Sequence, residues 1–225
     1  MGVSRNGPQG EHSGKVGKIV YYMLNGQQVS RTVGYTIKPA TASQLSARLM
    51  TKTCNEFLSR FKEFINVGFG VEASGTVKNA FNLAVQYNRR TIIKGVYPDF
   101  GIDYEKVILS AGTLKPAENW HVTETGQGMQ YNWGTDPQMA WPESTDQVMM
   151  LAYFPEQQKV IYTLFGSSRL SGSDVLEIPE GLQGKHAETF MSFVSADRKR
   201  LANSVYTGSF NNGLLKGLLT GGTQQ

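Results

Sequence analysis

The chain has 225 residues, of which 40% are hydrophobic, 11% aromatic and 18% charged, and it contains one cysteine, Cys54. This length is sufficient to bury a sizeable core, and the low charged fraction with many aromatics argues against a disordered chain. A single cysteine excludes an internal disulfide and a multi-cysteine metal cluster. No apolar run reaches the ~18 residues of a membrane span, and the first residues lack the apolar core of a secretory signal, so we expect synthesis in the cytoplasm.

The formal net charge of +4 hides an asymmetry between the two halves of the chain. Residues 1–96 contain 13 Lys and Arg against 4 Asp and Glu, a net charge of +9. Residues 97–225 contain 9 against 14, a net charge of −5. A basic half is typical of proteins that bind nucleic acid, an anionic surface or an acidic protein. Because the chain also carries an acidic half, this asymmetry predicts head-to-tail association of identical copies. The alternative is that the basic residues simply form a solvated helix face.

Residues 1–37 read as a glycine-rich arm followed by a β-hairpin. Five glycines and almost no apolar residue predict a flexible arm through Gly17. Two β-rich runs, Ile19–Leu24 and Gln27–Val33, flank Asn25-Gly26, the pair favoured in a type I′ turn. A lone hairpin is marginally stable in water, so we expect this one to pack on its own chain or on a neighbour.

Residues 38–96 read as an amphipathic helical hairpin. Thr41 and Gln44 form a capping box, and apolar residues then recur in steps of four from Leu45 to Ile65. This pattern predicts a long helix that ends near Gly68. A shorter helix over 77–88 is expected to follow and to end at Arg89-Arg90.

The hydrophobic period changes to two after residue 97, and short strands with turn residues between them fill the stretch to residue 212. The expected strands are Lys106–Leu109, Trp120–Glu124, Met129–Trp133, Gln147–Phe154, Lys159–Phe165, Asp174–Ile178, Glu188–Ser195 and Ser204–Ser209. This pattern predicts an antiparallel β-sandwich like those of immunoglobulin and fibronectin type III domains, with Trp133 in its core. The expected fold class is therefore α+β, with the hairpin and two helices preceding the sandwich.

Residues 213–225 form a Leu/Gly-rich tail. Leu214, Leu215, Leu218 and Leu219 are too few to span a bilayer and too apolar for a free tail. The tail is expected either to pack on its own domain or to insert into a neighbouring subunit.

A search for reactive groups gives none in a recognisable pattern. His12, His121 and His186 are each isolated, without metal-ligand spacing, and Cys54 lies on the apolar stripe of the long helix. Residues 10–16 superficially resemble a phosphate loop, but one residue is missing between the glycines and Val16 replaces the expected Ser or Thr. We therefore expect no catalytic, cofactor-binding or metal-binding residue, and a protein that is not an enzyme.

Several motifs together resemble an uncharacterised family, widespread in Bacteroidota genomes and catalogued as a domain of unknown function. The motifs are the run Ser13–Tyr21 followed by Asn25-Gly26 and Arg31, Thr41-x-x-Gln44-x-x-x-Arg48, Ala80-Phe81-Asn82-x-Ala84, Tyr97-Pro98 through Val107, Phe193–Asp197 and Asn203–Gly208. The resemblance covers about residues 5–209 and implies no catalytic residues. The N-terminal pattern is also similar, more loosely, to small phage virion proteins.

These observations favour a non-enzymatic structural subunit that self-assembles, as a virion component or a filament. Open strand edges accept foreign strands, so the arm or hairpin is expected to complete the sheet of a neighbour. Basic-to-acidic contacts between copies that do not close into a ring would give a fibre. The expected assembly interface comprises Ile19, Tyr21, Tyr22, Leu24, Arg31, Arg48, Leu214, Leu215, Leu218 and Leu219. Other virion or surface proteins are further candidate partners.

Two alternatives stay open. In the first, the sandwich binds a glycan or a protein through exposed aromatics at Trp120, Trp133 and Trp141, of which Trp141 in the loop-like stretch 137–144 is expected to be the most exposed. In the second, cations and aromatics of the basic half, such as Tyr21 and Arg31, bind nucleic acid without sequence preference.

Overall fold

The computed structural model describes residues 2–4, 10–35, 38–139 and 141–212, and the chain divides into two compact units, Met1–Gln44 and Leu45–Gln225. The Leu-rich tail with Leu214, Leu215, Leu218 and Leu219 lies outside the described residues. Within the described residues, no helix has the length and apolar character needed to cross a membrane.

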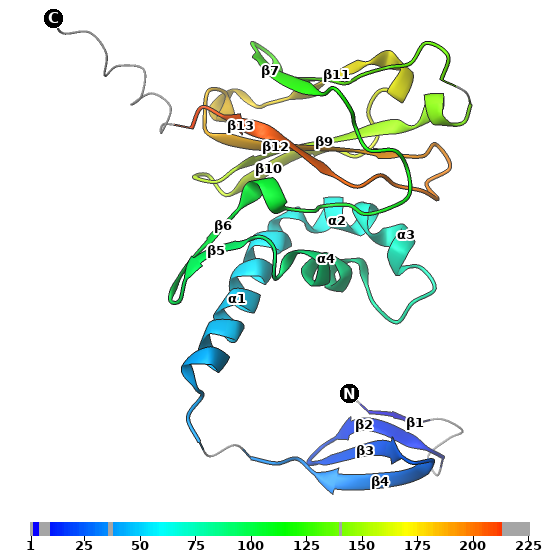
Figure 1. Cartoon of the computed structure of the whole chain (residues 1–225), viewed down its shortest axis with the longest axis vertical. Helices are drawn as coiled ribbons and strands as arrows, with labels where there is room; N and C mark the ends of the chain where they lie inside the picture. Colours follow the sequence, from blue (N-terminus) through cyan, green and yellow to red (C-terminus); the bar gives the residue numbers. More distant parts are fainter. Residues whose placement is uncertain (1, 5–9, 36–37, 140, 213–225) are drawn as a thin grey trace, which may run out of the picture. The chain divides into compact units, whose positions relative to one another are not determined.

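The first unit is a four-stranded antiparallel sheet in which each strand pairs with the next along the chain (Figure 1). Its strands are β1 (Val3–Ser4), β2 (His12–Val16), β3 (Ile19–Leu24) and β4 (Gln27–Thr32). The hairpin prediction is confirmed: Leu24 pairs with Gln27, and Asn25 and Gly26 adopt φ values of 50° and 80°. The flexible-arm prediction is wrong for His12–Val16, because the free edge of β3 pairs with this segment despite its few apolar residues.

The first long helix begins where its capping signal places it. Gln44 N donates to Thr41 Oγ1 over 3.3 Å, and Thr41 N donates to Gln44 Oε1 over 3.1 Å, which is a complete capping box before α1 (Ala42–Leu58). A 3₁₀ turn, Ser59–Phe61, interrupts the predicted long helix before α2 (Lys62–Gly68) and α3 (Gly70–Ala73). The second predicted helix is α4 (Ala80–Asn88), capped by the Asn79 side chain.

The strand pattern after residue 97 is confirmed for seven of the eight predicted strands. The observed strands are β7 (His121–Thr125), β8 (Gly128–Asn132), β9 (Gln147–Phe154), β10 (Lys159–Thr163), β11 (Ser173–Glu177), β12 (Ala187–Val194) and β13 (Val205–Phe210). They form two antiparallel sheets, in the orders β10-β9-β12-β13 and β11-β8-β7. The predicted α+β class with mostly antiparallel strands is therefore confirmed.

The predicted strand Lys106–Leu109 is wrong. A short hairpin, β5 (Ile93–Val96) with β6 (Asp99–Ile102), and a 3₁₀ turn over Tyr104–Lys106 precede it instead. Backbone groups of this stretch bond to side chains: Ile108 N donates to Asn88 Oδ1 over 2.8 Å, and Leu109 N donates to Ser204 Oγ over 2.8 Å. Side chains from distant segments thus satisfy the backbone that a strand partner would otherwise satisfy.

In the second unit, the sheet β10-β9-β12-β13 is buried on both faces, and this explains why β9 is apolar from Val148 to Phe154. Met149, Leu151 and Tyr153 pack in a core with the helices, whereas Val148, Met150, Ala152 and Phe154 pack against the three-stranded sheet. Helices, four-stranded sheet and three-stranded sheet therefore form three layers (Figure 1). Successive residues of a strand point to opposite faces of the sheet. A strand that lies between two cores therefore carries apolar residues toward both faces.

Candidate assembly and binding surfaces

The N-terminal sheet exposes apolar side chains on both of its faces. Residues directly opposite each other in antiparallel strands share a face, so the register puts Val20, Tyr22 and Leu24 with Arg31 on one face. Ile19, Tyr21 and Met23 occupy the other face, where the Tyr21 ring lies 5.4 Å from the His12 ring. Among the described residues of this unit whose side chains are placed, none is buried.

The exposed fractions of these side chains are large for a folded sheet. Leu24 is 52% exposed, Met23 48%, Ile19 39% and Tyr22 37%. Apolar groups that keep a third to a half of their surface in water gain only part of the burial free energy that a core would give them. The described part of this unit therefore contains a sheet without a core.

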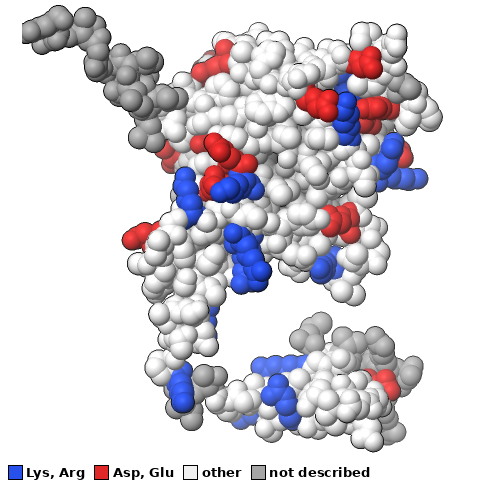
Figure 2. All heavy atoms as spheres, viewed as in Figure 1, with Lys and Arg blue, Asp and Glu red and all other residues white. Residues whose placement is uncertain are grey.

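The predicted interface residues divide between the two units. Tyr22, Leu24 and Arg31 share one face of the N-terminal sheet, while Ile19 and Tyr21 lie on the opposite face. Arg48 belongs to α1 of the second unit, where its side chain is exposed. Lys and Arg dominate the charged groups of the N-terminal sheet (Figure 2), and none of them has an ion-pair partner among the described residues.

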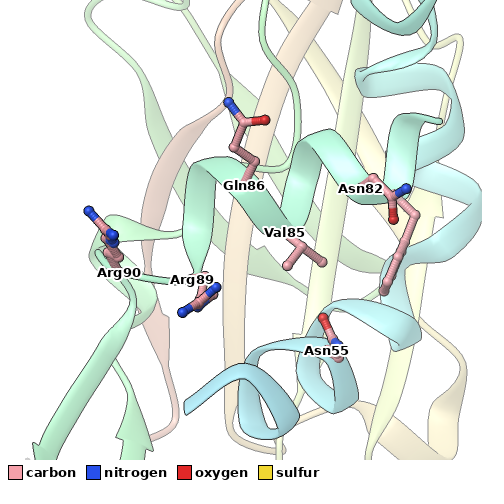
Figure 3. A pocket seen from close by; sticks show the side chains of 7 residues that line it. Asn55, Asn82, Val85, Gln86, Arg89 and Arg90 are labelled. Carbon is pink, nitrogen blue, oxygen red and sulfur yellow. The ribbon is translucent and has the colours of Figure 1, made fainter. Parts of the chain in front are cut away.

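A cavity of about 560 Å³ lies between α1 and α4 (Figure 3). Asn55 of α1 and Val85 of α4 face each other across it, and Arg89 and Arg90 follow the end of α4. No carboxylate lines this cavity. Cations at the end of a helix are favoured by its dipole, so the two arginines have a structural reason to lie here. They add a second basic surface, on the helical layer.

The three tryptophans differ in exposure. Trp141 is 80% exposed, as the sequence predicts, and Trp120 is 38% exposed. The prediction that Trp133 is exposed on a binding surface is wrong, whereas its predicted place in the sandwich core is confirmed: it is 6% exposed, and its Nε1 donates to the Arg169 carbonyl over 2.7 Å. Only the core position lets its ring pack edge-on against Phe193.

The histidine and cysteine predictions have separate outcomes. His186 is not isolated, because its Nε2 lies 2.9 Å from Glu188 Oε1, and Tyr206 donates to the same carboxylate over 2.6 Å. The spacing could have suggested this pair, since His186 directly precedes β12 and Glu188 lies two residues further on. Cys54 is fully buried, and burial raises the pKa of its thiol to about 11. Among the residues that the structure describes, no group of three potential metal ligands is found.

Sequence reasoning missed a buried ion pair between two connections of the sandwich. Arg169 Nε lies 3.5 Å from Asp146 Oδ2, and the two side chains are 4% and 1% exposed. Burial raises the pKa of the Asp146 carboxyl, and the Arg169 guanidinium opposes that shift. Neither residue belongs to a local motif, so no signal in the sequence distinguishes them.

Comparison with known proteins identifies a family but no activity. The model of a family of unknown function (DUF6266) matches residues 11–208. No curated protein and no solved structure matches the chain. The resemblance to an uncharacterised domain family is thereby confirmed.

Proposed function

Because the chain belongs to a family of unknown function, DUF6266, we propose a function from its own surfaces: it is a non-enzymatic structural subunit that self-assembles through its N-terminal sheet. In this proposal the basic sheet of one copy docks on the acidic sandwich half of the next. Such a head-to-tail contact builds a filament or a virion component when it does not close.

The sheet without a core is the observation that carries this proposal. Isolated hairpins are marginal in water, and a sheet needs packing against another layer to be stable. The described residues of the first unit provide no second layer, although both faces offer apolar side chains such as Tyr22 and Met23. A neighbouring copy would supply the missing layer.

The free edge of the N-terminal sheet supports the proposal further. The strand order places β4 at one edge, paired only with β3. Its sequence, Gln27–Thr32, contains no proline and only one charged residue, Arg31. Prolines and charges are what commonly prevent an edge strand from pairing with another chain, so β4 is poorly protected against such pairing. Addition of a strand from a neighbour would satisfy its outward backbone groups.

Charge complementarity supports the choice of a second copy as the partner. Residues 1–96 carry a net charge of +9 and residues 97–225 a net charge of −5. Opposite potentials on one chain favour head-to-tail over head-to-head contact, because like-charged surfaces repel.

We further propose that the sandwich is of the fibronectin type III kind. In constant immunoglobulin domains the first, second, fourth and fifth strands form one sheet. Here the fourth strand of the sandwich, β10, pairs with the third, β9, and so joins the sheet of β12 and β13. This order supports a fibronectin-like connection, and it leaves β7 and β11 as the edges of the smaller sheet.

The assembly proposal is tested by light scattering after size-exclusion chromatography of the full chain at low salt. The wild type is expected to form oligomers that grow with concentration, and negative-stain microscopy is expected to show filaments or other ordered assemblies. The double variant Tyr22→Ser/Leu24→Ser, which removes two of the apolar groups on the face that they share with Val20, is expected to be monomeric.

A control variant removes two exposed apolar groups of the second unit. Val77 and Val96 belong to the second unit and are 104% and 81% exposed. Val77→Ser/Val96→Ser is expected to assemble like the wild type. A wild type that stays monomeric at every concentration, or a Tyr22→Ser/Leu24→Ser variant that assembles normally, would overturn the proposal.

A further inference from the structure

The connections at one end of the sandwich line an open cavity of about 350 Å³. The register brings the start of β9 beside the end of β12 and the end of β10, so the connections β8–β9, β10–β11 and β12–β13 meet at this end. Residues of the segment before β7 join them. The cavity is lined by Thr113, Leu114, Lys115, Trp141, Pro142, Glu143, Asp146 and Arg200.

The cavity wall is held by the buried Asp146–Arg169 pair. Arg169 Nη2 donates to the Lys115 carbonyl over 2.7 Å, and Arg169 N donates to the Asp146 carbonyl over 2.6 Å. One side chain thus ties together the segment before β7, the β8–β9 connection and the β10–β11 connection. Arg200 is held separately, because its backbone N and O bond to Ser195 across the β12–β13 turn. Binding sites in proteins are mostly pre-formed in this way.

Trp141 provides an apolar platform at the cavity. Its indole is 80% exposed although burial of so large a ring would be favourable. Nothing in the described part of the chain covers it. A flat partner that stacks on the ring would remove this apolar area from water.

Two charged groups at the cavity, one hydrogen-bond donor and one acceptor, have no ion-pair partner among the described residues. Lys115 is paired with Glu118 at 2.9 Å. The Arg200 guanidinium and the Glu143 carboxylate have no ion-pair partner among the described residues. A guanidinium only donates hydrogen bonds and a carboxylate only accepts them, so the two together match a ligand whose groups do both.

We propose that this cavity binds a neutral saccharide. The apolar face of a sugar ring would stack on Trp141, while adjacent hydroxyl groups accept from Arg200 and donate to Glu143. Hydroxyls are the common groups that donate and accept at once, whereas an anionic ligand would use Arg200 but be repelled by Glu143. The inference does not rest on the assembly proposal, because it is argued only from the residues that line this cavity.

The experiment uses the full-length chain and a panel of neutral oligosaccharides: glucan, mannan, galactan and N-acetylglucosamine hexamers. Isothermal titration calorimetry is expected to detect binding of at least one of them, with quenching or a shift of tryptophan fluorescence. Trp141→Ala is expected to weaken that binding about tenfold or more, the size expected for loss of one aromatic contact. Glu143→Gln and Arg200→Gln are expected to weaken it severalfold.

Trp120→Ala is the matched control, since Trp120 is a partly exposed tryptophan that does not line the cavity. It is expected to bind like the wild type, and thermal unfolding verifies that each variant is folded. The proposal is overturned if no neutral saccharide binds, if Trp141→Ala and Trp120→Ala behave alike, or if only acidic oligosaccharides bind.

Discussion

The Arg169 guanidinium lies 3.8 Å from the centre of the Phe193 ring and 3.5 Å, through Nε, from Asp146 Oδ2. A cation is therefore enclosed between an aromatic face and a carboxylate inside the sandwich. Such a pair is costly to bury, and it is maintained only while both partners are present. At this position it also fixes the loops that carry Trp141 and Lys115.

Asp146→Ala is expected to destabilise the protein by about 3–5 kcal/mol, because it leaves the Arg169 charge buried without a counter-ion. Urea unfolding followed by circular dichroism measures the loss. The exposed pair Lys52–Glu56 is the control, with side chains 69% and 62% exposed. Lys52→Ala is expected to cost less than about 1 kcal/mol. Equal costs for the two variants would contradict the structural role of the buried pair.

Asn88→Ala is expected to cost at least about 2 kcal/mol of unfolding free energy. Asn88 is fully buried, its Nδ2 donates to the Ile108 carbonyl over 2.7 Å, and its Oδ1 accepts from Ile108 N. The substitution leaves both backbone groups of Ile108 without these partners. Asn82→Ala, an exposed position on the same helix, should change stability by less than about 0.5 kcal/mol in the same urea titration. A cost for Asn88→Ala no greater than that of Asn82→Ala would contradict the role of these bonds.

Local signals predicted the elements of this fold well, and contacts between distant segments explain the exceptions. The Thr41–Gln44 capping box and the Asn25-Gly26 turn depend on residues within a few positions of each other, so the sequence reveals them directly. The strand expected at Lys106–Leu109 is absent because Asn88 and Ser204 bind its backbone. The pairing of His12–Val16 was missed because it depends on the edge of β3 rather than on its own composition.

The candidate sites were predictable only where exposure follows from local sequence. Trp141 was expected to be exposed because prolines and polar residues surround it. Asp146 and Arg169 lie on separate connections and meet only once the two sheets stack, so neither their pairing nor the cavity beside them could be read from spacing. The packing of helices against one face of β9 likewise follows from tertiary contacts that periodicity does not encode.

Cys54 is expected to react very slowly with a chromogenic disulfide reagent at pH 8. Burial raises its pKa to about 11, so about one molecule in a thousand carries the thiolate at that pH, and the sulfur is also shielded. Absorbance should rise quickly only after addition of guanidinium chloride, which exposes the thiol. Fast, complete reaction of the native protein would show that the core between α1 and the sheet opens readily.

Asp197 is expected to contribute to the loss of stability in acid. Ser195 Oγ donates to its carboxylate over 2.6 Å and lowers the pKa of the group. Because the folded pKa lies below the unfolded value of about 3.9, the stabilisation is complete above that pH and is lost as the pH falls through the folded pKa. Thermal unfolding between pH 7 and pH 2.5 should therefore show a shallower acid decline for Asp197→Asn than for the wild type. Parallel curves would contradict the expected linkage.

The proposed assembly is expected to weaken as salt increases, because its partners carry opposite charge. At 1 M ionic strength the screening length falls to about 3 Å, against about 10 Å at 0.1 M. Arg31 lies on the face of Tyr22 and Leu24, so Arg31→Glu should reduce oligomer size at low salt and leave little salt dependence. Lys62→Glu makes the same charge change at an exposed position of α2 and serves as its control. Light scattering at 0.05 to 1 M NaCl compares the oligomer sizes of the two variants. Assembly that strengthens with salt would point to apolar contact alone.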